Sequence, residues 1–256
     1  MTAIFDTHAH YDDKAFDEDR EALIASLPEN GIAKVVNIGA SLASCKRTLE
    51  LAEKYDFFLA AIGVHPSDTG ELNDGNFEEL KKMCLHEKCV AVGEIGLDYY
   101  WDEPERSIQK EWFVRQINLA RELGKPMVIH SRDAAQDTIE IMKVEKSEEI
   151  GGVIHCYSYT KETARTFLDM GFYFGIGGVL TFNNAKKLKE AAEYIPMDRI
   201  VLETDCPYLA PVPYRGKRNC SLYLPNVVET LAQIKGIEEE TVRKLAWENA
   251  HKLYRL

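Results

Sequence analysis

The sequence predicts a single-domain α/β protein with the closed (β/α)8 architecture of a TIM barrel, extending over residues 1–256. Three observations predict it: eight short apolar runs, helical segments between them, and nearly constant spacing. Strands that are apolar on both faces and alternate with helices are typical of a parallel sheet covered by helices. Eight such units of similar length favour a closed cylinder.

The predicted strands are short runs of β-branched residues that end near a polar residue. They are AIFDTH, KVVNIG, FLAAIG, VAVGEI, PMVIH, GVIHCY, FYFGIG and IVLETD. Their carboxyl ends fall near residues 8, 38, 63, 94, 130, 155, 176 and 204. The mean interval is about 28 residues, which fits one strand with the helix and loops that follow it.

Apolar residues at helical spacing occupy the segments between these strands. We expect Ser41, Asp133 and Thr160 to cap the amino ends of three of these helices. The longest helix is expected over residues 104–123. A final helix over residues 238–254 is expected to pack outside the barrel.

The charge of the chain limits its possible partners. There are 31 basic and 42 acidic side chains, which give a formal net charge of -11 at pH 7. A protein with this balance repels polyanions as a whole, so non-specific coating of nucleic acid is excluded. A phosphate-containing substrate would need a local basic patch or bound metal cations.

Other features of the sequence bear on its location. No run approaches 18 consecutive apolar residues, and the first ten residues include an acid and two histidines rather than a leader-like apolar stretch. The six cysteines form no CxxC pair, which is typical of reduced thiols in a cytosolic protein. We therefore expect a cytoplasmic protein with no membrane segment and no obligate protein partner.

Ionisable residues gather at the carboxyl ends of the predicted strands, where barrel enzymes carry their chemistry. Strand one contains Asp6, His8 and His10, whose equal parity predicts that all three point to one side. The other strand ends supply six further residues: His65, Glu94, His130, His155, Glu203 and Asp205. Five of the seven histidines in the chain thus lie at strand ends.

This concentration of side chains favours bound metal ions. A single histidine near a strand end is more often an ordinary hydrogen-bonded group than a ligand. Several imidazoles and carboxylates converging on one barrel mouth are costly to bury unless a cation organises them. Imidazole with carboxylate suits Zn, Mn, Fe or Ni, and a carboxylate-rich site also accepts Mg. The number of ligands favours two ions about 3.5 to 4 Å apart.

Seven motifs occur in a fixed order: FDTHAH, GVHP, GEIGLDYYWD, PMVIHSRDA, HCYS, LETDCPYLAPVPYRGKRN and WENAHKLY. From residue 4 to the final helix, this set resembles the TatD family of metal-dependent nucleases. The resemblance implies an amidohydrolase-like barrel and two divalent metal ions, with Mg, Mn and Zn as candidates. It also implies a DNA substrate whose phosphodiester bonds are hydrolysed, with exonuclease action as in some members.

Carried over by position, the resemblance implies four ligands of one ion: His8, His10, Glu94 and Asp205. The ligands it implies for the other ion are Glu94, His130 and His155, so that Glu94 bridges the pair. The chain departs from the family in one place, because Cys220 and Ser221 follow RGKRN where Glu-Pro is usual. That departure concerns the loop and its substrate contacts, not the metal ligands.

Three residues are expected to be catalytic. Glu94 would bridge the ions, which lower the pKa of a bound water to about 7 and polarise the phosphate. Asp205 would accept the proton of the attacking water. His65, implied by the resemblance as a phosphate contact or proton donor, would stabilise the developing charge or protonate the leaving oxygen.

Substrate-binding residues are expected close to these ligands. Arg215, Lys217 and Arg218 follow strand eight and could grip the phosphate backbone, although a solvated loop paired with nearby acids is the alternative. Arg132 directly follows His130 and is placed similarly.

Three aromatic residues, at positions 99–101, could stack on bases, and packing against the loop is the alternative. Asp6 is expected to orient the strand-one histidines, and Glu203 to support the site from one layer deeper.

Three functions remain open. The first is a metal-dependent deoxyribonuclease that trims strands from an end. The second keeps the metals but cleaves an ester or amide, for example as an aminoacyl-tRNA deacylase, and the basic loop favours phosphate over a neutral amide. The third is a metal-holding barrel without turnover, which a full set of ligands at the strand ends argues against.

Overall fold

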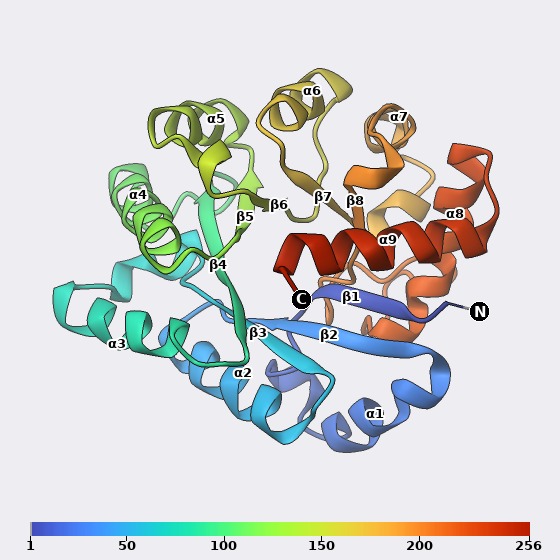
Figure 1. The fold of residues 1–256 in the computed structure, drawn as a ribbon, viewed down its shortest axis with the longest axis horizontal. Helices are drawn as coiled ribbons and strands as arrows, with labels where there is room; N and C mark the ends of the chain where they lie inside the picture. Colours follow the sequence, from blue (N-terminus) through green and yellow to red (C-terminus); the bar gives the residue numbers. More distant parts are fainter. Residues whose placement is uncertain (1) are drawn as a thin grey trace.

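A computed structural model describes residues 2–256 and confirms the predicted α/β barrel. Eight strands form one sheet in sequence order, and every neighbouring pair is parallel (Figure 1). The strands are β1 (Ile4–Ala9), β2 (Ile32–Ile38), β3 (Phe58–Ile62), β4 (Cys89–Asp98), β5 (Met127–Arg132), β6 (Gly152–Ile154), β7 (Tyr173–Ile176) and β8 (Ile200–Leu202).

The cylinder is nearly closed, and the last strand meets the first through a few hydrogen bonds. The carbonyl of His8 accepts the amide of Asp205 at 2.9 Å, and the amide of His10 donates to Cys206 at 2.9 Å. These bonds join the carboxyl ends of β1 and β8 directly. They therefore bring residues from the two ends of the sequence into one site.

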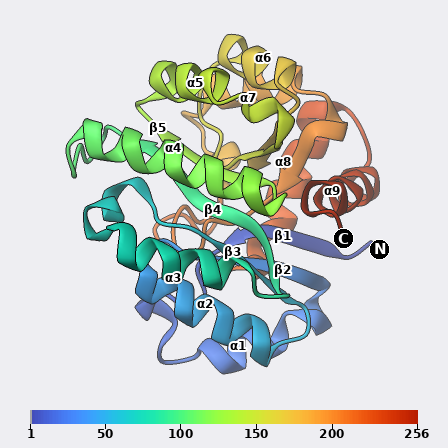
Figure 2. The same ribbon diagram turned by 60° about the vertical axis from the view of Figure 1, so that its left-hand side comes forward.

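A helix follows each strand and lies outside the sheet (Figure 2). The eight helices are α1 (Arg20–Ser26), α2 (Leu42–Lys54), α3 (Asp74–Cys84), α4 (Arg106–Leu123), α5 (Ala135–Val144), α6 (Lys161–Asp169), α7 (Lys186–Tyr194) and α8 (Leu224–Lys235). Apolar side chains of these helices pack against the outer faces of the strands. Strands buried on both faces explain the continuous apolar runs in the sequence.

Two of the three predicted helix caps are confirmed. Ser41 accepts the amide of Ser44, and Thr160 accepts the amide of Thr163. The prediction for Asp133 was wrong, because α5 begins at Ala135 and no side chain caps it. Asp133 takes a left-handed backbone conformation with φ 52°, which places it in the loop before the cap position.

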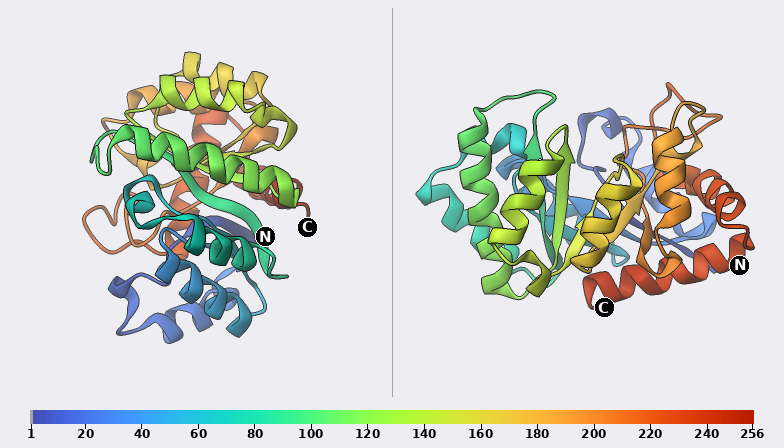
Figure 3. Two further views of the ribbon diagram at one scale, coloured as in Figure 1. Left: turned by 90° about the vertical axis from the view of Figure 1, so that its left-hand side faces the viewer. Right: turned by 90° about the horizontal axis from the view of Figure 1, so that it is seen from above.

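The ninth helix, α9 (Glu239–Tyr254), closes the amino-terminal end of the barrel (Figure 3, right). Its residues Leu253 and Tyr254 join a buried cluster with side chains from inside the cylinder, among them Phe5, Val36 and Val201. The Tyr254 hydroxyl donates to the carbonyl of Thr7 at 2.8 Å. The helix lies outside the cylinder of strands, as expected, and Leu253 and Tyr254 also contact residues inside the cylinder.

Within residues 2–256, no helix is both long enough and apolar enough to cross a membrane.

Candidate metal centre

A cavity of about 680 Å³ opens at the carboxyl ends of the strands. It is lined by seven of the site residues expected from the sequence: His10, His65, Glu94, His130, Arg132, His155 and Asp205. His8 lies beside them, only 1% exposed. Most of the strand-end histidines and carboxylates that the sequence singled out therefore meet at one place, and Asp6 and Glu203 are the exceptions.

One group of donor atoms forms around the histidines of β1. The Nε2 atoms of His8 and His10 face each other at 3.1 Å. One carboxylate oxygen of Glu94 lies 3.4 Å from the first and 3.7 Å from the second. Asp205 Oδ1 lies 3.7 Å from His8 Nε2 and 3.4 Å from His10 Nε2. Two nitrogens and two oxygens thus converge on one small volume.

A second group forms around the other oxygen of Glu94. Its Oε1 lies 2.7 Å from His130 Nδ1 and 2.7 Å from His155 Nε2. Those two nitrogens are 3.1 Å apart. The two oxygens of the Glu94 carboxylate therefore face two different pairs of imidazole nitrogens. Each oxygen of Glu94 is thus available to a different group of donor atoms.

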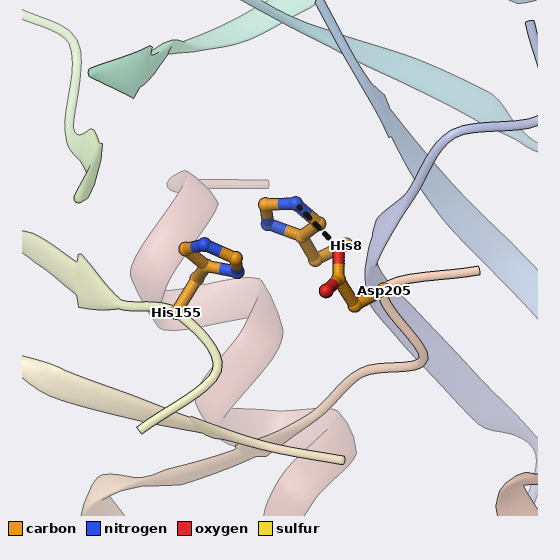
Figure 4. Close-up of side chains that lie close together, drawn as sticks. All are labelled: His8, His155 and Asp205. Carbon is orange, nitrogen blue, oxygen red and sulfur yellow. Dashed lines mark ion pairs between the residues drawn. The ribbon is translucent and has the colours of Figure 1, made fainter. Parts of the chain in front are cut away.

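The two groups are in direct contact across the barrel axis. Figure 4 shows His8 between His155 and Asp205, with the Asp205 carboxylate directed at the His8 ring. The rings of His8 and His155 are stacked, with centroids 4.0 Å apart and planes inclined by 12°. A single compact cluster is the result.

Glycines allow the strands to approach closely at this level. A Cβ at Gly96, where φ is 146°, would overlap the carbonyl oxygen of His130. A Cβ at Gly175 would overlap the carboxylate of Glu203. Larger residues would therefore separate β4 from β5 and displace a buried acid.

Charges in the cluster compensate each other. Burial opposes ionisation of Glu94, but the surrounding histidines outweigh it and hold the pKa of Glu94 well below its usual range. Burial also disfavours charge on His10, yet Asp205 and Glu94 raise its pKa to about 9. The pKa of His8 falls to about 4 because of burial and the neighbouring His155.

These residues fit divalent cations. Imidazole nitrogens 3.1 Å apart need a proton or a cation between them, and this occurs twice in the cluster. Neutral imidazoles with carboxylates are a donor set that binds Zn, Mn and related ions. A cation would displace the protons that His10 and His130 otherwise hold with pKa values of about 9.

His65 borders the second group. Its Nε2 lies 3.8 Å from Glu94 Oε1, and its ring meets the ring of His130 edge-on with centroids 4.3 Å apart. Its Nδ1 accepts the amide of Ser67 at 3.2 Å, so a neutral ring carries its hydrogen on Nε2. Burial and His130 lower the pKa of His65 to about 3, which favours that neutral form.

The sequence reasoning missed Asp98, the last residue of β4. This side chain is 1% exposed, and its Oδ2 lies 3.1 Å from His130 Nε2. The available signal was parity, since Asp98 is four positions beyond Glu94 in the same strand.

Glu203 lies outside the cavity lining and next to His155, in agreement with the supporting position expected from the sequence. Glu203 accepts the amide of Cys156 at 2.6 Å and lies 3.8 Å from His155 Nδ1. Burial raises its pKa to about 8.

The expectation that Asp6 orients the strand-one histidines was wrong. Its carboxylate binds the hydroxyls of Thr204 and Ser221 and reaches only the backbone amide of His8. A register shift along β1 between Asp6 and Ala9 breaks the alternation on which the equal-parity argument depended.

The cations at the mouth differ in part from those expected. Arg132 lines the cavity and stacks on the ring of Tyr100, with its guanidinium carbon 3.8 Å from the centroid. Lys14 and Arg47 also line it, and no sequence motif marks them. Arg47 carries an exposed guanidinium 3.6 Å from the carboxylate of Asp12.

The basic loop after β8 lies outside the cavity lining. Arg218 forms two hydrogen bonds with Asp19, of 2.7 and 2.6 Å, and packs on the ring of Phe16. Arg215 stacks on Phe182, and Lys217 lies 6.0 Å from the centroid of Tyr214. The alternative of pairing with a nearby acid therefore applies to Arg218.

Aromatic residues stand at the rim. Trp101, 64% exposed, lines the cavity together with Tyr208. Tyr99 is held elsewhere, because its hydroxyl donates to Asp137 and the Arg106 guanidinium covers its ring.

Fold and site together define a metal-dependent hydrolase of the barrel type, with its chemistry at the carboxyl ends of the strands. A family model described as TatD related DNase matches residues 5–255. The chain belongs to this family, as its motifs predicted.

Curated relatives and solved structures agree with this assignment. An uncharacterized metal-dependent hydrolase, YabD of Bacillus subtilis, is 43% identical over 99% of both chains. A relative from Cronobacter sakazakii named 3'-5' ssDNA/RNA exonuclease TatD is 31% identical and covers 98% of this chain and 97% of its own length. The crystal structure of YJJV, a TATD homolog from Escherichia coli k12, has a TM-score of 0.93 and 28% identity over 99% of this chain and 98% of its own.

Proposed function

We propose that this protein is a metal-dependent exonuclease that hydrolyses phosphodiester bonds at the ends of single DNA strands. The observation that carries the proposal is the Glu94 carboxylate, whose two oxygens face two separate pairs of imidazole nitrogens. The nuclease name of the Cronobacter relative supports the substrate class.

Six residues would hold the two divalent ions in this proposal: His8, His10, Glu94, His130, His155 and Asp205. When bound, two such cations would polarise the phosphate and acidify a water molecule. They would also reverse the local charge, because their four positive charges together with Lys14, Arg47 and Arg132 exceed the six carboxylates that line the cavity. That reversal allows an acidic protein to bind a polyanion at this one place.

Asp205 and His65 would move protons. Asp205 lines the cavity with its side chain 17% exposed, so its carboxylate can accept a proton from an attacking water. His65 carries its hydrogen on Nε2 and so can donate a hydrogen bond to a phosphate oxygen or to the leaving oxygen.

Cations around the mouth would bind the phosphates next to the scissile bond. Arg132, the last residue of β5, and Arg47, in α2, both line the cavity. We assign Arg215 and Lys217, both exposed, to nucleotides farther along the strand. Arg218 would support their loop through its ion pair with Asp19.

The rim favours an unpaired strand. Trp101 and Tyr208 are both more than half exposed and line the same cavity as the metal cluster. Base–aromatic stacking needs bases free of a duplex, so these rings fit a single strand or a frayed end.

Metal-depleted protein should be tested on oligonucleotides labelled at the 5' or the 3' end, with Mg, Mn or Zn added back. We expect mononucleotide release from single strands, restored by metal and abolished by a chelator. The labels then give the polarity. Purified protein with two bound ions that cleaves no oligonucleotide would contradict the proposal.

Hydrolysis of a carboxylic ester or amide, as in an aminoacyl-tRNA deacylase, is the second candidate. The observation in its favour is that Asp13 and Asp68 add negative charge to the cavity lining, which repels phosphate. Parallel assays with a simple phosphodiester and an ester analogue, at low salt, separate the two candidates.

A further inference from the structure

Asp98 is fixed at the junction of the metal cluster and the aromatic rim. The side chain of Gln109 holds the backbone of Asp98 through two hydrogen bonds. The Asp98 amide donates to Gln109 Oε1 at 2.9 Å, and Gln109 Nε2 donates to the Asp98 carbonyl at 3.1 Å. Gln109 is fully buried in α4. The carboxylate of Asp98 therefore extends from a rigid position at the end of β4.

One oxygen of this carboxylate acts on a candidate metal ligand. Oδ2 lies 3.1 Å from His130 Nε2, while the other ring nitrogen faces Glu94 and His155. A hydrogen bond from Nε2 to a carboxylate fixes the tautomer that leaves the Nδ1 lone pair free for a cation. It also fixes the orientation of the ring.

The other oxygen acts on the rim. Oδ1 accepts the backbone amides of Tyr100 at 2.9 Å and Trp101 at 3.2 Å. Tyr100 lies under the guanidinium of Arg132, and Trp101 lines the cavity. The turn that carries both aromatic side chains is thus bound to the same carboxylate as His130.

We propose that Asp98 is a positioning residue with two functions: it orients His130 toward the metal centre and it sets the turn that places Trp101 over the mouth. The second function rests on the proposed nucleic-acid substrate, and the first does not. Ligand geometry and strand placement would then depend on one side chain that is not among the six proposed metal ligands.

Two substitutions separate these functions. In Asp98→Asn the amide oxygen can still accept the two backbone amides, but the amide nitrogen cannot accept the His130 hydrogen. Asp98→Ala removes both interactions. Asp102→Asn is the matched control, because this exposed acid lies four residues along the same segment and pairs with Arg106.

Metal binding tests the first function. Metal-depleted protein would be titrated calorimetrically with Zn or Mn. We expect Asp98→Asn to weaken one of the two binding events by roughly 10- to 100-fold. The other event and the Asp102→Asn control should change little. A general structural defect would weaken both ions, and an unchanged titration would overturn this part of the proposal.

Trp101 reports on the second function. In a background with Trp112→Phe and Trp247→Phe, Trp101 is the remaining tryptophan, since the chain has three. We expect Asp98→Ala to change its emission and acrylamide quenching, and Asp98→Asn to leave both near the parent values. Equal behaviour of the two variants would overturn this part. Should Asp98→Ala fail to fold, Asp98→Leu provides the same comparison, because leucine has a similar shape and also lacks an acceptor oxygen.

These readouts do not need turnover. Failure of the nuclease assay with both readouts as expected would refute the substrate and leave the positioning of His130 intact. Normal nuclease activity with both readouts unchanged in Asp98→Asn and Asp98→Ala would refute the role of Asp98 alone.

Discussion

The two ends of the barrel are built from the same eight strands and hold opposite kinds of side chain. At the amino-terminal end, Phe5, Val36 and Val201 pack against Tyr254 of α9 in a buried apolar cluster. At the carboxyl-terminal end, the space inside the cylinder holds the candidate metal ligands around Glu94. One end therefore supplies stability, and the other can supply chemistry.

The difference also explains why the ionisable cluster is tolerated. Burial of charged groups is costly unless they are paired. The apolar end has no such cost, and α9, which covers that end, stabilises the barrel that holds the ionisable cluster. Substitutions at the amino-terminal end should therefore lower the free energy of unfolding, whereas substitutions at the carboxyl-terminal end should lower activity and metal binding.

Glu94→Gln should have the largest effect on activity. An amide has one carbonyl oxygen, and its nitrogen would direct hydrogens at one of the two imidazole pairs, so it cannot bridge two cations. We expect kcat to fall by roughly 10³-fold and metal binding to weaken. Steady-state kinetics and metal analysis measure both, with circular dichroism to check the fold.

Glu105→Gln is the matched control, because this acid is exposed on the loop before α4. It should keep normal activity. A Glu94→Gln protein with two tightly bound ions and normal turnover would remove Glu94 from the metal centre.

Phe5→Ala should lower stability and leave activity unchanged. Phe5 is 2% exposed and contacts three rings of α9, those of Trp247, His251 and Tyr254. Loss of this side chain should lower the free energy of unfolding by about 3 to 5 kcal/mol. Metal content and kcat at 25 °C should remain unchanged. Denaturant unfolding together with kinetics tests this. A fall in kcat without loss of stability would contradict the assignment of stability to the amino-terminal end and of chemistry to the other.

The sequence predicted the barrel and the convergence of the strand-end residues because both depend on local patterns repeated eight times. Each strand carries its own apolar run, and the carboxyl ends of parallel strands share one edge. No long-range distance was needed to place Glu94 near His130.

Parity with Glu94 could have pointed to Asp98, but the role of this residue could not be predicted from a local pattern. Its role depends on the pairing of β4 with β5, which sets Gly96 opposite His130 and Asp98 opposite Arg132. The prediction for Asp6 was wrong for a related reason, because a register shift in β1 cannot be recognised from a pattern of alternating residues. The cations at the mouth were the least predictable, because the position of α2 decides whether Arg47 reaches the mouth and the path of a loop decides whether Arg218 does.

Trp101→Ala should affect substrate binding more than metal binding. Base–aromatic stacking contributes about 1 to 3 kcal/mol per base. We therefore expect the dissociation constant for a short single-stranded oligonucleotide to rise by roughly 5- to 100-fold. Fluorescence anisotropy with Ca in place of the active metal measures this without turnover.

Trp101→Phe keeps an aromatic ring and should restore most of the affinity. If Trp101→Ala bound the oligonucleotide as tightly as the parent protein, the rim would be a structural feature rather than part of the binding site.

Arg132→Ala and Arg218→Ala should have the smallest effects, and they compare a cation inside the mouth with one outside it. Arg132 lines the cavity, so its loss should raise KM several-fold and reduce the slope of log KM against log salt by about 1. Arg218 is already neutralised by Asp19, so its loss should leave that slope unchanged and lower the free energy of unfolding by at most about 1 kcal/mol. KM measured over a range of salt concentrations separates the two. A slope that falls for Arg218→Ala but not for Arg132→Ala would place the phosphate contact on the basic loop, because only a cation that replaces counterions changes the slope.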